Sequence, residues 1–168
     1  KGYVDDFTIF DTTLNAETIA NVYSTYTLSA SDALPLNQWS HVVANYDKTQ
    51  KTTEIFVNGS NIGKYENYDA NVLNNNSNIV FGDGFVGELG EVVIFERPLF
   101  ESEISYLATN TDRFLTSKTL FRATFEDLGV THIIDSSPMS NNAVLAGAAT
   151  YTVGNVLNSK ALVFNGSQ

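Results

Sequence analysis

Cysteine is absent from this 168-residue chain, so disulfide bonds, thiol nucleophiles and cysteine-based zinc sites are excluded. The chain has only two histidines, which leaves little basis for a transition-metal site. Basic residues are scarce: nine Lys and Arg stand against 19 Asp and Glu, for a formal net charge of −10. So acidic a chain does not neutralise a phosphate backbone, which argues against nucleic acid and anionic membranes as partners. No apolar run approaches the roughly 18 residues of a membrane-spanning helix, so we expect no membrane insertion.

Short β-type runs separated by turn residues make up most of the chain. Apolar and polar residues alternate in them with the period of two that is typical of strands. Asn58-Gly59 is a strong signal for a two-residue hairpin turn between two such runs. Outside the repeat described below, the predicted strands cover residues 26–29, 39–46, 53–57, 60–64, 79–81, 119–125, 143–146, 151–153 and 161–164. Many short strands with frequent turns predict an all-β sandwich or barrel.

One segment of the sequence occurs twice. Residues 2–14 align without gaps to residues 87–99, and the match continues through Ile19 and Ile104. The first copy alternates from Val4 to Phe10, and turn residues break both copies at Thr12-Thr13 and at Arg97-Pro98, so each copy predicts a strand, a turn and a short helix. Similar residues stand at four further positions: Val4 and Leu89, Asp6 and Glu91, Phe7 and Val92, and Asp11 and Glu96.

Three groups of motifs resemble the laminin-G-like, concanavalin A-type lectin/glucanase family of jelly-roll domains. Trp39-Ser-His-Val-Val-Ala-Asn-Tyr-Asp47, followed by Ile55-Phe-Val-Asn-Gly59, is similar to the central hairpin of that family. The repeated segment is similar to its closing strand and helix, and residues 120–127, 135–142 and 154–166 are similar to its opening strands. The resemblance implies an all-β, antiparallel jelly-roll β-sandwich with one short helix after each closing strand.

The order of these motifs divides the chain into three pieces. Residues 1–23 match the closing strand and helix of one module, and residues 24–111 match the back half of a module, from central hairpin to closing strand. Residues 112–168 match a front half, which either completes 24–111 or belongs to the next module. Three explanations stay open: a window cut from a tandem array, a circular permutation, or a stretch of sequence missing between residues 23 and 24.

The resemblance also implies a calcium site. In the family, an acid before the closing strand contributes to such a site together with acids of the opening strands. The matching residues are Asp5 or Asp6, with Glu126 and Asp127 from a front half. Calcium takes about six to eight oxygen ligands, which paired carboxylates and loop carbonyls supply. The alternative is a solvated strand edge, and the second copy of the repeat keeps only one of the two carboxylates.

Ligand-binding candidates lie in polar loops at one edge of the predicted sandwich, because loops on such scaffolds often carry binding residues. They are Asn74 and Asn76 in the loop 71–78, Asp83 between two glycines, and Asn141 and Asn142 in the loop 136–142. Turn chemistry explains Asp83 equally well, because Asp tolerates turn conformations and accepts local backbone hydrogen bonds.

Two acidic pairs come nearest to the paired carboxylates that glycoside hydrolases use. Glu101 and Glu103 fall at the predicted start of a helix, where the helix dipole favours acids. Glu126 and Asp127 are adjacent, so on a strand they point to opposite faces. Neither pair has the required geometry, and we expect the chain not to be an enzyme.

These observations favour a non-catalytic recognition or adhesion module of a multi-module surface or secreted protein. It would bind a glycan or a protein on a surface through its edge loops, next to neighbouring modules of the same or another chain. Its expected location is extracellular, on a cell surface or on a virion surface, and the one cofactor in the prediction is Ca2+. Two alternatives stay open: a purely structural module of a filament, surface layer or virion, and an accessory domain of a glycoside hydrolase.

Overall fold

The computed structural model describes residues 34–66, 79–82, 85–110, 118–126, 132–145, 150–154 and 160–166. They fall into two compact units. Unit 1 takes its described residues from Phe81–Arg97 and Asn110–Gln168. Unit 2 takes its described residues from Val4–Val80 and Pro98–Thr109.

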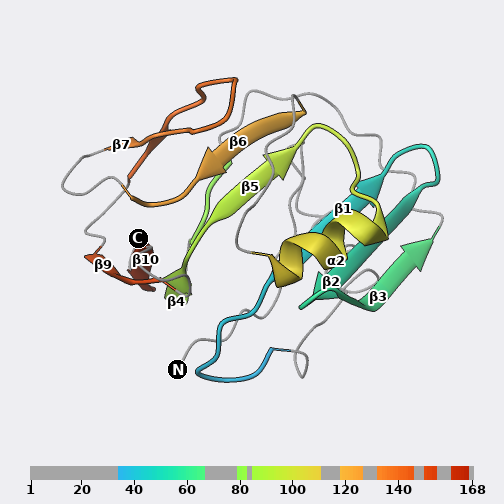
Figure 1. Cartoon of the computed structure of the whole chain (residues 1–168), viewed down its shortest axis with the longest axis horizontal. Helices are drawn as coiled ribbons and strands as arrows, with labels where there is room; N and C mark the ends of the chain where they lie inside the picture. The colour runs from blue at the N-terminus through green and yellow to red at the C-terminus, as the bar shows by residue number, and fades with distance from the viewer. Residues whose placement is uncertain are drawn as a thin grey trace, which may run out of the picture. The chain divides into compact units, whose positions relative to one another are not determined.

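Unit 2 contains a three-stranded antiparallel sheet in the order β1-β2-β3 (Figure 1). Its strands are β1 (Val42–Asp47), β2 (Thr52–Val57) and β3 (Ser60–Glu66). Asn58 and Gly59 join β2 to β3 with φ angles of 50° and 82°, as a type I′ hairpin turn requires. The predicted hairpin is confirmed, although β1 begins at Val42 and not at residue 39.

Helix α2 (Glu101–Thr109) packs on this sheet. Its Ile104 and Leu107 are buried. Gly59 lies so close to the helix that a Cβ built on it would be 3.3 Å from the Cβ of Ala108. The turn between β2 and β3 therefore requires glycine twice, for its positive φ and for the approach of α2.

A buried amide joins β1 to the segment that leads into α2. Asn45 Nδ2 donates a hydrogen bond of 3.1 Å to the Leu99 carbonyl, and the Leu99 N–H donates one of 2.8 Å to Asn45 Oδ1. Both residues are buried. The Asn45 side-chain amide therefore satisfies both the N–H and the carbonyl of Leu99, the two backbone groups that a neighbouring strand would otherwise pair with.

Unit 1 consists of short antiparallel strands. They are β4 (Val86–Leu89), β5 (Val92–Phe95), β6 (Thr119–Ala123), β7 (His132–Ile133), β8 (Ala143–Val144), β9 (Thr150–Val153) and β10 (Lys160–Asn165). β10 lies between β4 and β9, β7 pairs with β8, and β5 pairs with β6, beside which it lies in Figure 1. Consecutive strands β4 and β5 thus belong to different sheets.

The core of unit 1 is aromatic and aliphatic. Its buried residues are Phe121, Ala123, Phe125, Ile133, Leu162 and Phe164. Phe81 stacks on Phe121 with ring centroids 6.1 Å apart, and Phe85 meets Phe164 edge to face at 5.9 Å. A Cβ on Gly82, whose φ is 81°, would overlap the Phe164 ring.

Three predictions about strands are wrong in detail. The second copy of the repeat forms two strands, because the chain leaves the ladder at Gly90-Glu91 between β4 and β5. Residues 79–81 form no strand, and β6 ends at Ala123 because Phe125 adopts a φ of 57°. The predicted strand, turn and helix order of this copy is otherwise confirmed.

In the described residues the protein is β-rich with one short helix. None of the helical structure described is long and apolar enough to span a membrane. The predicted boundary at 23/24 and the first copy of the repeat lie outside the described residues, and the division into modules stays a prediction.

Candidate functional site

The loop that connects β7 to β8 has a buried polar side and an exposed side. Ile133, Asp135 and Ser137 are buried, whereas Ile134 and Ser136 are exposed. Residues 138–142 are exposed as well. The side chains of residues 133–137 thus alternate between the interior of unit 1 and solvent, and residues 138–142 form a tip that faces solvent.

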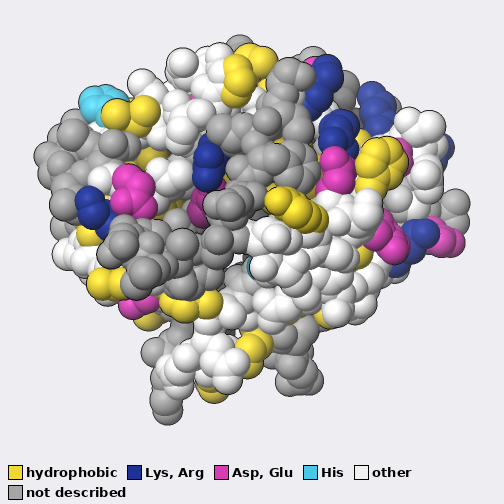
Figure 2. Space-filling model, viewed as in Figure 1, with side chains coloured by type: hydrophobic (Ala, Val, Ile, Leu, Met, Phe, Trp, Pro, Cys, Tyr) yellow, Lys and Arg dark blue, Asp and Glu magenta, His cyan; other side chains and the backbone are white. Residues whose placement is uncertain are grey.

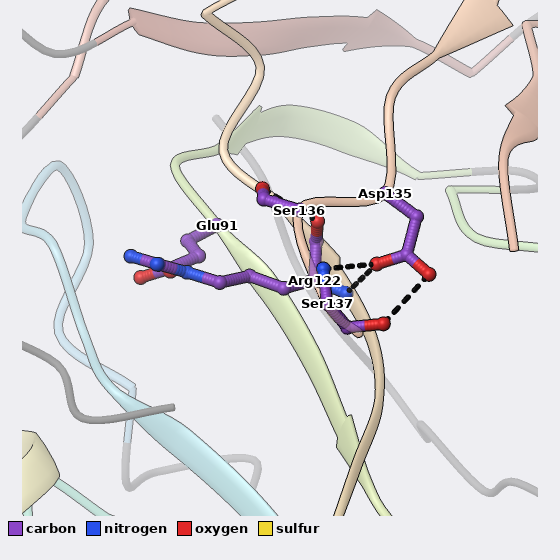
Figure 3. Close-up of polar contacts among 5 residues, drawn as sticks. All are labelled: Glu91, Arg122, Asp135, Ser136 and Ser137. Atoms are coloured by element: carbon purple, nitrogen blue, oxygen red, sulfur yellow. Dashed lines mark hydrogen bonds and ion pairs between the residues drawn. The ribbon is translucent and has the colours of Figure 1, made fainter. Parts of the chain in front are cut away.

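Asp135 accepts four hydrogen bonds through its two carboxylate oxygens, and Figure 3 shows those from Arg122 and Ser137. Oδ1 accepts from the backbone N–H groups of Arg122 and Ser137, both at 2.8 Å. Oδ2 accepts from the Ser137 hydroxyl at 2.8 Å and from the Asn141 N–H at 2.6 Å. Asp135 itself is 5% exposed, so these partners replace water around its charge.

The environment of Asp135 favours its ionised form. Burial raises the pKa of this carboxyl, but the hydrogen bonds from Ser137, Arg122 and Asn141 outweigh burial and hold the pKa below its usual range. Asp135 is therefore a carboxylate at neutral pH.

Asn141 and Asn142, two predicted ligand residues, hold the same loop by hydrogen bonds. The Asn142 side-chain oxygen accepts from the Asp135 N–H at 3.0 Å. Asn141 Nδ2 donates to the Leu120 carbonyl at 2.8 Å. Ser140, directly before Asn141, has a φ of 55°, a left-handed conformation. The structure thus gives both asparagines a positioning role, and ligand contact by either stays a prediction.

Arg122 of β6 connects the loop to β5. Its carbonyl accepts from the Ser136 N–H at 2.9 Å and from the Ser136 hydroxyl at 3.2 Å. Its side chain runs away from Asp135 to Glu91, where Nε lies 2.6 Å from Oε1 (Figure 3). The two side chains of this ion pair are only 21% and 12% exposed, so solvent screens them less than a surface pair.

The remaining predicted site residues do not come together in the described part of the chain. Asp5, Asp6, Asn74, Asn76, Asp83 and Asp127 lie outside the described residues. Glu126 is exposed, and its Oε1 accepts from the Lys160 N–H at 3.1 Å. Among the described residues, no group of three or more His, Asp or Glu side chains is placed to hold a metal ion. Calcium binding stays a prediction.

The chemistry open to Asp135 is limited by its partners. A carboxylate offers about four lone-pair positions, and four donors already occupy them. Metal ligation or proton transfer would require breaking these bonds. The arrangement therefore fixes the shape of a loop and leaves the exposed residues of its tip for contact.

The predicted acidic pair at the helix start also has a local role. Glu101 and Glu103 lie in the first turn of α2, as expected. Glu103 Oε2 accepts a hydrogen bond of 2.9 Å from the Phe100 N–H, which is a capping interaction.

Sequence reasoning missed Asp135 as the centre of this site. The signal was present in Asp135-Ser-Ser137, because Asp and Ser two residues apart favour a turn closed by side-chain hydrogen bonds. The contributions of Arg122 and Asn141 carry no such local signal, since both reach Asp135 through the tertiary fold.

A family model described as the concanavalin A-like lectin/glucanases superfamily matches residues 19–105, about half of the chain. The matched stretch contains the β1-β2-β3 hairpins, both strands of the second copy of the repeat and the start of α2. A search of curated proteins and a search of solved structures each found no match.

Proposed function

The chain belongs to the concanavalin A-like lectin/glucanase superfamily, and from this we propose that it is a non-catalytic recognition module that binds a glycan or a protein. The binding surface in this proposal is the exposed side of the β7–β8 loop, formed by Ile134, Ser136 and residues 138–142. The observation that carries it is the buried Asp135 carboxylate, whose four hydrogen bonds fix a loop with an exposed tip.

A fixed loop favours recognition because little conformational entropy remains to be lost on binding. The groups that the loop presents are uncharged. Ile134 is 51% exposed and Met139 is 47% exposed, next to the exposed residues Ser136 and Pro138. Apolar surface beside hydroxyl and amide groups suits a neutral partner, such as a sugar ring or a peptide segment.

We also propose that the small sheets are parts of a jelly-roll sandwich. The family membership supports this, and so does the passage of the chain from β4 in one sheet to β5 in another. Strands that change sheets across a bend are a feature of sandwich corners.

The absence of catalysis is part of the same proposal. The described acids that come closest to an active-site arrangement already have structural partners. Asp135 bonds to backbone and hydroxyl donors, Glu91 pairs with Arg122, and Glu103 caps α2. We infer an extracellular, cell-surface or virion-surface location from the proposed surface partner.

Exposed hydrophobic side chains on the viewed face stand in small groups among polar and charged ones (Figure 2). A broad hydrophobic interface is therefore a weaker candidate on that face than contact through a loop tip.

A glycan array and a panel of cell-surface proteins, each probed with and without a calcium chelator, test the proposal. The informative variant is Met139→Ala, which shortens an exposed side chain without removing a hydrogen bond described for the loop. Val153→Ala is the matched control, because Val153 is 74% exposed on β9 of the same unit. We expect at least one ligand whose binding falls about tenfold or more in Met139→Ala and stays unchanged in Val153→Ala.

Binding that both variants leave intact would place recognition elsewhere and refute the loop assignment. Loss of binding on chelation, with Met139→Ala still active, would favour a calcium site over the loop. No binding to any glycan or protein, with assembly that depends on protein concentration, would favour the structural alternative.

A further inference from the structure

Met139 carries the only sulfur atom of the chain, which has one methionine and no cysteine. Hydroperoxides oxidise the sulfur of proteins before other side-chain atoms, because sulfur is polarisable and gives up electrons readily. In a chain with several sulfur atoms, such an oxidant is divided among them. Here it has one sulfur target, and that target lies in the β7–β8 loop.

The position of Met139 makes its thioether accessible. The residue is 47% exposed, and its neighbours Pro138 and Ser140 are exposed as well. Methionine more often lies in a core, where it fills irregular gaps, and Met139 is not a member of the buried core of unit 1. Because oxidation of sulfur follows its exposure, this side chain is open to an oxidant in the folded protein.

The backbone of Met139 is fixed independently of its side chain. Its N–H donates to Ser137 Oγ at 3.2 Å, and the same hydroxyl donates to Asp135 Oδ2 at 2.8 Å. Pro138 before it has a restricted φ, and Ser140 after it has a φ of 55°. The hydrogen bonds described for this loop use backbone, hydroxyl, carboxylate and amide groups, so an oxygen added to the sulfur breaks none of them.

We propose that Met139 is a modification site at which a hydroperoxide converts the thioether to a sulfoxide. The sulfur attacks one peroxide oxygen, and the O–O bond breaks as the S–O bond forms. The departing oxygen takes up the proton and leaves as water or an alcohol, so sulfur loses two electrons and the peroxide gains them. Methionine sulfoxide reductases reverse the step: two thiols become a disulfide, and the sulfoxide oxygen leaves as water.

The modification changes the chemistry of the exposed side of the loop, and this consequence rests on the proposed function. That side presents Met139 and Ile134, which is 51% exposed, as apolar surface. A sulfoxide is polar and accepts hydrogen bonds, so an apolar partner group that covers it removes its water and supplies no donor. Oxidation should therefore weaken binding about tenfold, and reduction should restore it.

Intact-mass spectrometry of the full chain in dilute hydrogen peroxide at neutral pH tests the modification without a binding partner. We expect one added oxygen atom at residue 139, located by peptide mapping, at a rate within about tenfold of that of free N-acetylmethionine amide. Met139→Leu should gain no oxygen at this rate, and a methionine sulfoxide reductase with a dithiol should restore the original mass. Slower uptake by the natural chain, or uptake at another residue, would overturn the assignment.

Urea unfolding of the oxidised chain tests whether the change is confined to the side chain. The midpoint should equal that of the untreated chain, because none of the hydrogen bonds described for the loop is lost. A chain that unfolds at lower urea concentration after oxidation would overturn a change of surface chemistry alone.

The glycan array and the protein panel, probed with untreated and oxidised chains, test the effect on binding. Met139→Leu controls for other damage by peroxide: its binding, at whatever level, should be the same before and after treatment. Val153→Met in that background moves the single sulfur atom to a residue that is 74% exposed on β9, where oxidation should leave binding unchanged. Met139→Gln puts a polar group at the loop without peroxide and should bind about tenfold more weakly than the natural chain.

The outcomes separate the modification from the proposed function. A partner whose binding falls in Met139→Ala but survives oxidation would overturn the effect on binding, while the loop assignment stands. Binding that Met139→Ala leaves intact would refute the loop assignment together with this effect, and the mass measurement alone would then decide the modification. Loss of binding on oxidation of the Val153→Met chain would show general damage and overturn the effect as well.

Discussion

Replacing Asp135 by asparagine removes the charge from the centre of the β7–β8 loop while nearly preserving its shape. One oxygen remains to accept from the Arg122 and Ser137 N–H groups. The new amide group is a donor where Oδ2 was an acceptor. The Ser137 hydroxyl can rotate and accept, but the Asn141 N–H then faces another donor and loses its partner.

The magnitude follows from these four bonds. A hydrogen bond to a charged group contributes about 1.5–3 kcal/mol and a neutral one about 0.5–1.5 kcal/mol. Asp135→Asn loses one charged bond and converts the others to neutral ones, while it relieves the cost of burying a charge. We expect unit 1 to lose about 3 kcal/mol of unfolding free energy at neutral pH.

The effect should depend on pH in one direction. The hydrogen bonds hold the folded-state pKa of Asp135 below the value of about 3.9 expected for an unfolded chain. The stabilisation by this carboxylate is therefore complete above about pH 4 and declines as the pH falls through the folded-state pKa. The difference between wild type and Asp135→Asn should shrink over that acidic range.

Urea unfolding followed by far-UV circular dichroism at pH 7 and at several values below pH 4 measures both effects. Fluorescence of Trp39 does not serve here, because the single tryptophan belongs to unit 2. Asp47→Asn is the control: Asp47 Oδ1 accepts from the Thr49 and Gln50 N–H groups in an exposed turn, and its loss should cost under about 1 kcal/mol. A change at Asp135 no larger than at Asp47, or one independent of pH, would refute this account.

Three further substitutions test the packing of each unit. Asn45→Ala removes the amide that satisfies both backbone groups of Leu99, and should lower the stability of unit 2 by about 2–4 kcal/mol, measured by Trp39 fluorescence in urea. Gly59→Ala places a Cβ against α2 at a φ of 82° and should cost about 1–2 kcal/mol in the same assay. Gly82→Ala forces a Cβ into the Phe164 ring and should destabilise unit 1 by about 2–4 kcal/mol, measured by circular dichroism. A neutral result at any of the three would contradict the contact on which it rests.

Local signals predicted the parts of the fold that depend on neighbouring residues. Asn58-Gly59 determined a hairpin turn, because few other dipeptides adopt two positive φ angles, and α2 starts where two acids and a preceding break predicted it. We did not predict that the strand of the second repeat copy divides at Gly90, because this copy was aligned with the first, which alternates without a break and has Asp5 in place of Gly90. β4 pairs with β10 and β5 pairs with β6, and a local sequence pattern cannot predict these pairings because the partner strands lie far along the chain.

In the candidate site too, local features could be predicted from the sequence and contacts made by the tertiary fold could not. The Asp135-Ser-Ser137 turn could be anticipated, whereas the bonds from Arg122 and Asn141 depend on β6 reaching the loop. The repeat was visible in the sequence, but the sequence did not predict that two of its acids, Glu91 and Glu96, form ion pairs with Arg122 and Lys118.

The register of β4 with β10 has a consequence for synthesis on the ribosome. Leu89 pairs with the position of Leu162, so β4 emerges from the ribosome well before its partner exists. At about 5–20 residues per second, the wait is on the order of 4–15 s. The strands and helix of unit 2 are complete by Thr109, so that unit can fold during this interval. Throughout it β4 lacks its partner β10, whereas β5 lacks its partner β6 only until Ala123 has been synthesised, so the edge of β4 is exposed longest to any neighbouring nascent chain.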